Sequence, residues 1–220
     1  MVKQTKFIKI QDVDCLKTLE LCQNKNFYIF NLDNTLYDPK PKMWIEFGKN
    51  LVIKLNERND RKFTLKDILG LYNNFGCSYA PCAEFYGLRK NDLDFIFETR
   101  IYNDFLEEDK ELTNIFKNIK EPKLIMTNSC KLHVEKCLKA LNMENLFDLV
   151  IYNDYFNQNK LCKPMLESFA AINNILKQKN PKNIFFFDDQ EKNIKSAKKS
   201  GWKSYFVSDR ASIKKILRNI

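Results

Sequence analysis

Several features that mark other protein classes are scarce in this chain of 220 residues. It has one histidine, His133, and its seven cysteines include no Cys-x-x-Cys pair, so a structural zinc site is not expected. The cysteine count is odd and the N-terminal residues lack a signal-peptide pattern, which favours reduced thiols and a cytoplasmic protein. No run approaches the roughly 18 apolar residues of a membrane-spanning helix, so we expect no membrane segment.

Glycine is also scarce, and internal repeats and Gly/Ser linkers are missing from the sequence. With only five glycines, loops are expected to be short or built from Asn and Asp. Hydrophobic residues make up 44% of the chain and aromatic residues 13%, which is enough for a sizeable core. The length suits one domain with an insertion, or two small domains.

The net charge of +9 comes from lysines that are spread along the chain and mixed with acidic residues. There is no arginine-rich arm and no nucleic-acid motif, so a solvated lysine-rich surface is favoured over nucleic-acid binding. The same charge would help to capture an anionic small molecule. The oligomeric state is left open.

Short apolar runs predict strands that are buried on both faces. Between the later runs, periodic apolar residues predict helices at 129–142, where Asn142 is a candidate left-handed end, and at 164–178, with Pro164 in the first turn. This alternation predicts an α/β fold with a parallel sheet. A further helix is expected at 12–23. The predicted strands are 7–10, 27–31, 123–127, 149–152, 183–187 and 203–207.

Residues 40–119 contain no convincing strand and instead carry three amphipathic patterns. Trp44 to Leu55 marks one helix, Thr64 is a candidate cap of a second, and Leu93 to Ile101 marks a third. The segment 76–82 reads equally as a substrate-facing loop or a plain connection. We therefore expect a small all-helical cap at 39–115, inserted into an α/β core of residues 1–38 and 116–220.

Polar side chains follow the predicted strands, at the edge where ligands bind in open α/β sheets. Carboxylate oxygens suit Mg²⁺, whereas a lysine, hydroxyls and helix N-terminal amides suit a phosphate. Metal and phosphate together indicate phosphoryl chemistry. These residues are Asn31, Asp33 and Thr35, then Thr127, Asn128 and Ser129, then Lys163, and finally Asp188, Asp189 and Asn193.

Four short stretches carry a resemblance to a known family. In order and spacing, N-L-D-N-T, T-N-S, C-K-P and F-D-D-Q-E-K-N resemble the four motifs of the haloacid dehalogenase-like superfamily. Its pyrimidine 5′-nucleotidase-like branch is resembled more closely by F-x-L-D-N-T-L-Y, by T-N-S with His133 six residues after Thr127, and by C-K-P. The resemblance implies a Rossmann-like core and Mg²⁺-dependent hydrolysis of a small phosphate ester, most simply a nucleoside monophosphate, through an aspartyl phosphate.

The resemblance also implies roles for individual residues. Asn31 stands where the family has its nucleophilic Asp, and Asp33 is the general acid and base, whose backbone carbonyl binds Mg²⁺. Thr127, Asn128 and Lys163 would hold the phosphate. The metal ligands implied are Asn31, Asp33, Asp188 and Asp189. His133 and Cys162 are expected to be structural.

Asn31 affects one step of the expected reaction, the nucleophilic attack on phosphorus. An amide oxygen is a feeble nucleophile, and losing a covalent nucleophile costs about 10⁴–10⁶ in rate, so binding without turnover is expected. An engineered Asp-to-Asn change and a natural pseudophosphatase that keeps the site to bind a phospholigand both fit the sequence. Haloacid or phosphonate chemistry is a weaker alternative, and the Mg²⁺-type carboxylates disfavour the haloacid route.

Overall fold

The computed structural model describes residues 4–15, 26–75, 77–100, 102–154, 156, 161–176 and 180–220, with the side chains of 13–15 left out. The chain divides into two compact units. The core unit is drawn from Met1–Pro39, Leu106–Asp154 and Asn159–Ile220. The helical unit is drawn from Lys40–Phe105 and Tyr155–Gln158. The bounds expected from the sequence, 1–38 and 116–220 for the core and 39–115 for the cap, stay predictions.

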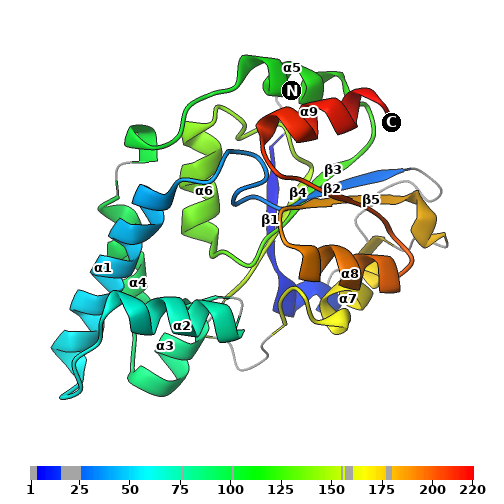
Figure 1. Ribbon diagram of the computed structural model, residues 1–220. Coiled ribbons are helices and arrows are strands. Elements are labelled where there is room, and N and C mark those ends of the chain that lie inside the picture. Colours follow the sequence, from blue (N-terminus) through cyan, green and yellow to red (C-terminus); the bar gives the residue numbers. More distant parts are fainter. Residues whose placement is uncertain are drawn as a thin grey trace. The chain divides into compact units, whose positions relative to one another are not determined.

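The core unit contains a six-stranded sheet in the order β1-β4-β3-β2-β5-β6, and all of its strand pairs are parallel (Figure 1). This confirms the predicted Rossmann-like α/β core. The predicted strands agree with the observed ones to within one residue at each end. The strands are β1 (Lys6–Lys9), β2 (Phe27–Phe30), β3 (Lys123–Met126), β4 (Leu149–Tyr152), β5 (Ile184–Asp188) and β6 (Lys203–Phe206).

The central strands are continuous apolar runs because both of their faces are covered. Every residue of β2, β3 and β5 is buried, whereas β1 and β6 at the sheet edges are partly exposed. On one face, Phe30 of β2 stacks on Phe187 of β5 at 4.7 Å, and Phe187 stacks on Tyr205 of β6 at 5.3 Å. These cross-strand aromatic pairs hold β2 and β5 in register just before the strands end.

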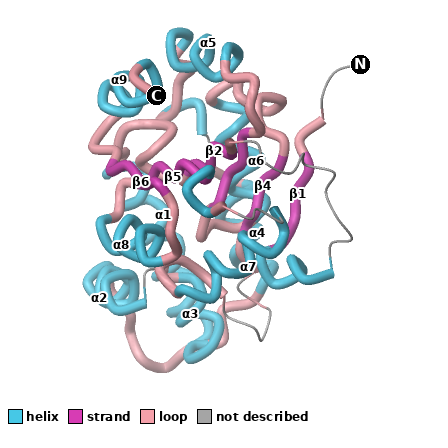
Figure 2. The backbone as a smooth tube through the Cα atoms, turned by 90° about the vertical axis from the view of Figure 1, so that its right-hand side faces the viewer, coloured by secondary structure: helices cyan, strands magenta, loops and turns pink. Residues whose placement is uncertain are grey.

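Helices cover both faces of the sheet. Figure 2 shows α5 and α9 on one side and α7 and α8 on the other. On the α7 side, Phe169 packs against Phe186 and Trp202 with ring centroids 5.7 and 5.1 Å away. The core helices are α5 (Lys110–Asn118), α6 (Lys131–Ala140), α7 (Leu166–Leu176), α8 (Glu191–Lys199) and α9 (Arg210–Arg218), with 3₁₀ turns at Ile10–Cys15 and Pro181–Asn183.

Two predicted helix ends can be compared with the structure. Asn142, just after α6, has φ 55°, which confirms the expected left-handed residue there. The helix predicted at 164–178 begins two residues later, at Leu166, and residues 177–179 lie outside the described part. Of the helix predicted at 12–23, the described residues form only the end of the 3₁₀ turn Ile10–Cys15, and residues 16–25 lie outside the description.

The described residues of the helical unit contain no strand, as predicted. The helix α2 (Leu65–Phe75) is preceded by Thr64, the predicted cap, whose hydroxyl donates to Asp67 Oδ2 at 2.6 Å while its backbone N–H donates to the same oxygen at 2.8 Å. One prediction was incomplete, because Tyr79–Tyr86 forms the helix α3, where a loop was expected at 76–82. The remaining elements are α1 (Pro41–Arg58), α2 (Leu65–Phe75), α4 (Lys90–Glu98) and a 3₁₀ turn at Tyr102–Asp104.

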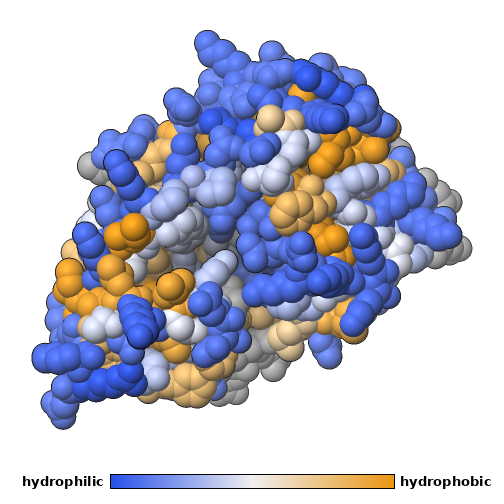
Figure 3. All heavy atoms as spheres, in the orientation of Figure 1, coloured by the Kyte–Doolittle hydropathy of each residue, from blue (hydrophilic) through white to orange (hydrophobic). Residues whose placement is uncertain are grey.

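The surface reflects the charged composition. Hydrophilic residues cover much of the face shown in Figure 3, with smaller apolar patches between them. Among the described residues, no helix is long and apolar enough to cross a bilayer. Many of the exposed large apolar side chains belong to the helical unit, including Ile45, Ile53, Leu65, Leu69, Tyr72, Phe75, Phe85 and Phe95.

Candidate functional site

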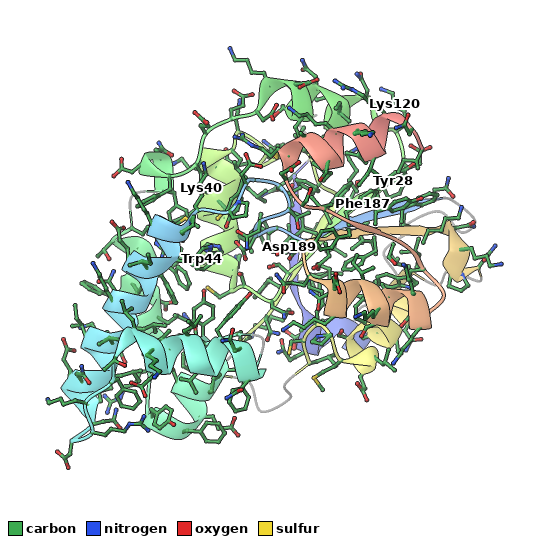
Figure 4. The ribbon with its side chains drawn as sticks, viewed as in Figure 1. Tyr28, Lys40, Trp44, Lys120, Phe187 and Asp189 are labelled. Atoms are coloured by element: carbon green, nitrogen blue, oxygen red, sulfur yellow. The ribbon has the colours of Figure 1, made fainter. Side chains whose placement is uncertain are left out.

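Three neighbouring strands bring the predicted polar residues to one edge of the sheet. The order β3-β2-β5 and the parallel pairing put the carboxyl ends of these strands side by side. The backbone N–H of Asn31 donates to the carbonyl of Phe187 at 2.8 Å, so pairing of β2 and β5 continues one residue into the polar segment. Figure 4 labels Phe187 within β5 and Asp189 directly after the strand. The sheet therefore fixes the backbone positions from which the polar side chains at the strand ends project.

Lys163 reaches this edge from the segment before α7. Its side chain is only 2% exposed, and its Nζ donates to Asn31 Oδ1 at 2.9 Å and to Asp188 Oδ2 at 2.7 Å. Asp188 is fully buried, so the ammonium and carboxylate balance one another away from water. The structure thus brings Asn31, Lys163 and Asp188 together although they lie far apart in the sequence.

Asn128 holds the backbone of Lys163 in place. Its Nδ2 donates to the Lys163 carbonyl at 2.8 Å, and its Oδ1 accepts from the Lys163 N–H at 2.9 Å. These two hydrogen bonds use both ends of the amide, so the observed role of Asn128 is to position the lysine. A direct contact between Asn128 and phosphate stays a prediction.

Thr127 lies at the end of β3 and is 2% exposed. Its backbone N–H donates to the Ile151 carbonyl at 3.0 Å, and its Oγ1 accepts from the Ser129 N–H at 3.0 Å. The second contact turns the chain after the strand, so that Ser129 faces the β2 segment. The predicted contact of Thr127 with phosphate is likewise still a prediction.

The Asp33 carboxylate sits in a cradle of three donors. Tyr37 Oη and His133 Nε2 lie 2.6 and 2.8 Å from Asp33 Oδ1, and Ser129 Oγ lies 2.5 Å from Oδ2. Burial opposes ionisation, but the charge and hydrogen bond of His133, with the hydroxyls of Ser129 and Tyr37, outweigh it and lower the pKa of Asp33 from 3.8 to about 2. Asp33 is therefore held as an ionised carboxylate.

Asp188 is the last residue of β5 and Asp189 follows it, and the two carboxylates have different environments. Asp188 Oδ1 accepts from the Gln190 N–H at 2.8 Å and from Asn193 Nδ2 at 2.9 Å, so this residue also helps to start α8. Asp189 Oδ1 accepts from Asn31 Nδ2 at 2.8 Å and from Thr35 Oγ1 at 3.3 Å. Burial and the neighbouring Asp188 carboxylate raise the pKa of Asp189. An additional positive charge near Asp189 would therefore stabilise its ionised form.

The sequence of this chain also matches a known protein family. A family model described as haloacid dehalogenase-like hydrolase matches residues 28–207, which include all four motif segments. This chain belongs to the haloacid dehalogenase-like hydrolase family. The resemblance inferred from the sequence is thereby confirmed at the level of the superfamily.

Individual proteins similar to this chain are also known. Phosphate metabolism protein 8 of Saccharomyces cerevisiae is 28% identical over 197 residues, which cover 80% of this chain and 60% of the yeast protein. The chain thus spans about 60% of the length of this curated relative. A HAD-like family hydrolase from Porphyromonas gingivalis matches with a TM-score of 0.55 and 18% identity, covering 88% of this chain and 98% of that one.

A third relative carries ligands. The structure of a HAD family enzyme from Bacteroides thetaiotaomicron, in complex with magnesium and inorganic phosphate, matches with a TM-score of 0.53 and 22% identity, covering 85% of this chain and 96% of that one. At this level of identity the similarity establishes the fold.

The oxygen atoms at this edge of the sheet indicate whether it suits a divalent cation. Hard cations such as Mg²⁺ take carboxylate and carbonyl oxygens. Asp33 O and Asp189 Oδ1 converge and are each 2.8 Å from the same atom, Asn31 Nδ2. These oxygens fit a magnesium ion, but the amide nitrogen of Asn31 already contacts them.

A second group with ligand chemistry lies beside the cradle. One ligand atom from each of Asp33, His133 and Cys137 falls within 4.8 Å of the other two. The geometry agrees better with hydrogen bonding than with a metal, because His133 Nε2 points at Asp33 Oδ1 at 2.8 Å and Cys137 Sγ lies 3.4 Å from the same nitrogen. His133 is therefore hydrogen-bonded, as expected of a structural histidine, and its partner is the expected acid–base residue Asp33.

Several side chains at the strand ends have no role predicted from the sequence. Thr35, Ser129 and Asn193 are predicted only as polar residues at strand ends. Tyr37 is not among the predicted residues, although the sequence places it four residues after Asp33 in F-x-L-D-N-T-L-Y. Hydrogen bonds now place all four against Asp33, Asp188 or Asp189.

Proposed function

We propose that this chain is the scaffold of a Mg²⁺-dependent phosphatase for a small phosphate ester, most simply a nucleoside monophosphate. The observation that carries the proposal is the buried Lys163, which bridges Asn31 and Asp188 beside the ionised Asp33. A buried ammonium next to a strand end suits a phosphate group. Family membership and the yeast relative, whose name refers to phosphate metabolism, support the same chemistry.

The reaction follows from the residues of the site. With Asp at position 31, a carboxylate oxygen would attack phosphorus, the ester oxygen would leave, and an aspartyl phosphate would form. Asp33, whose resting form is ionised, would first take a proton from solvent and give it to the leaving oxygen. It would later remove a proton from the water that attacks the aspartyl phosphate, which would release phosphate and restore the carboxylate of residue 31. Magnesium, held by Asp33 O, Asp189, Asp188 and residue 31, would neutralise phosphate charge. Thr127 and Lys163 would orient the phosphate.

As written, the chain has Asn31 and is expected to bind a phosphate ester but to turn it over poorly. The test is phosphate release with Mg²⁺ by the Asn31→Asp form over a panel of esters that includes UMP and CMP. We expect a gain of at least about 10⁴-fold over the unchanged chain. A double variant, Asn31→Asp with Lys163→Met, is the matched control. A folded Asn31→Asp protein that releases no phosphate from any ester would refute the proposal.

A second candidate is a pseudophosphatase that binds a phospholigand without turnover. It is favoured by Asn31, because both ends of its amide are hydrogen-bonded within the site. This candidate predicts that nucleotides or inorganic phosphate raise the melting temperature of the unchanged chain. If neither raises it, with or without Mg²⁺, the idea is wrong.

A further inference from the structure

The orientation of the Asn31 amide is determined by its neighbours. Lys163 Nζ lies 2.9 Å from Asn31 Oδ1, and an ammonium group can only donate hydrogen bonds. A flipped amide would place its NH₂ group against this ammonium. The nitrogen therefore points to the opposite side, toward Asp189.

On that side, the Asn31 nitrogen meets three oxygens. Nδ2 lies 2.8 Å from the Asp33 carbonyl, 2.8 Å from Asp189 Oδ1 and 3.2 Å from Thr35 Oγ1. Two of these are of the carbonyl and carboxylate types that a hard cation selects. An amide nitrogen carries partial positive charge on its hydrogens, so its contacts are of the same sign as those of a cation.

We propose that the Asn31 amide nitrogen takes the place of a divalent cation in this chain, so that Asn31 lowers Mg²⁺ affinity by occupying the site as well as by lacking charge. This inference rests on the proposed function, since that function supplies the metal. For Mg²⁺ to be coordinated by these oxygens, the amide must leave Asp33 and Asp189 and also break its contact with Lys163. The cation thus competes with hydrogen bonds to charged groups.

The missing charge of Asn31 and the occupation of the site by its amide predict different metal affinities for Asn31→Ala. If only the missing charge matters, Asn31→Ala should bind Mg²⁺ no better than the unchanged chain, because it removes a possible oxygen ligand and restores no charge. If the amide occupies the site, Asn31→Ala should bind better, because the oxygens of Asp33 and Asp189 become available. Both explanations predict that Asn31→Asp binds best.

The experiment is titration of the full chain with Mg²⁺ by calorimetry, repeated with Mn²⁺ by electron paramagnetic resonance. We expect the affinity order Asn31→Asp, then Asn31→Ala, then unchanged Asn31, with the alanine form about tenfold tighter than the unchanged chain. Asp189→Asn in the Asn31→Ala background is the matched control and should abolish the gain. Asn31→Ser is the second small variant, should Asn31→Ala fail to fold.

A second readout does not depend on affinity. In EDTA, Asn31→Ala should melt below the unchanged chain because Asp33 O and Asp189 lose the hydrogen bonds that Asn31 donates. Mg²⁺ should raise the melting temperature of Asn31→Ala more than that of the unchanged chain. If the folded alanine and serine forms bind Mg²⁺ no tighter than unchanged Asn31 while Asn31→Asp binds it, this inference alone is overturned. If Asn31→Asp also binds no metal, the proposed function falls as well.

Discussion

The two units of this chain each bury a cation, and they do so in opposite ways. In the core unit, Lys163 is held between the Asn31 amide oxygen and the Asp188 carboxylate. In the helical unit, Arg100 has 9% exposure, and its guanidinium carbon lies 5.0 to 6.0 Å from the centroids of four aromatic rings. Its Nη1 finds no hydrogen-bond partner among the described residues, and its Nη2 donates to the Met43 carbonyl at 3.3 Å.

The difference separates a cation paired with a buried carboxylate from a cation held by aromatic packing. Lys163 balances the Asp188 carboxylate at the strand ends, so removing its charge would leave that carboxylate without its partner. Arg100 lies on ring faces, where cation–π attraction and the apolar stem contribute, but no acidic partner is placed on it within the described part of the chain. The charge of Arg100 should therefore matter less than its shape.

The largest expected effect comes from removing the core cation. Lys163→Met leaves Asp188 as a buried charge without its partner, which should lower the free energy of unfolding by about 3–5 kcal/mol. Urea denaturation at neutral pH measures it. The matched control is Lys195→Met, because the Lys195–Glu191 pair is exposed and should contribute less than about 1 kcal/mol. A cost for Lys163→Met no larger than that of the control would remove the distinction drawn between the two cations.

The next effect concerns the donors around Asp33 in the same unit. His133→Leu keeps much of the buried volume but removes a donor to a carboxylate, so a loss of about 2–3 kcal/mol is expected. Urea denaturation again measures it. Val134→Ala, one residue away and also buried, reports the cost of lost apolar packing alone. If the cost of His133→Leu is the same at pH 7 and pH 3, its origin is packing and the carboxylate plays no part.

Acid should weaken the core unit through Asp33. The pKa of Asp33 in the fold is about 2, below the ordinary 3.8, so its ionised form contributes stability above pH 4. That contribution, about 2 kcal/mol, is lost as the pH falls from 4 to 2. The raised pKa of Asp189 acts in the opposite sense, since its protonation stabilises the fold as the pH falls through its own folded pKa.

Denaturation curves from pH 5 to pH 2 measure how the free energy of unfolding falls with pH. His133→Leu should make this fall smaller, because the pKa of Asp33 then moves back up toward its ordinary range. An unchanged slope in that variant would mean that other carboxylates cause the acid loss.

The sequence predicted the strand ends well because each is an apolar run followed by short polar residues, as at Asn31 and Asp188. It did not predict that Asn128 holds the Lys163 backbone, since nothing local links residues 35 positions apart. The helix α3 was missed because Pro81 resembles a turn signal. Pro81 is the third residue of that helix, where a backbone N–H has no partner within the helix, so proline is tolerated there.

The smallest effect is expected at the second cation. Arg100→Met removes a buried donor that has no acceptor among the described residues, which favours the variant, but it also loses the attraction to the rings of Phe47 and Phe97. These contributions oppose one another, so the free energy of unfolding should change by no more than about 1 kcal/mol. Denaturation of Arg100→Met beside Arg100→Ala measures it, and the alanine form should lose more because it also removes the stem. If Arg100→Met lost as much free energy of unfolding as Lys163→Met, the charge of Arg100 would have to be balanced by an acidic group. Both cations would then be held by charge pairing.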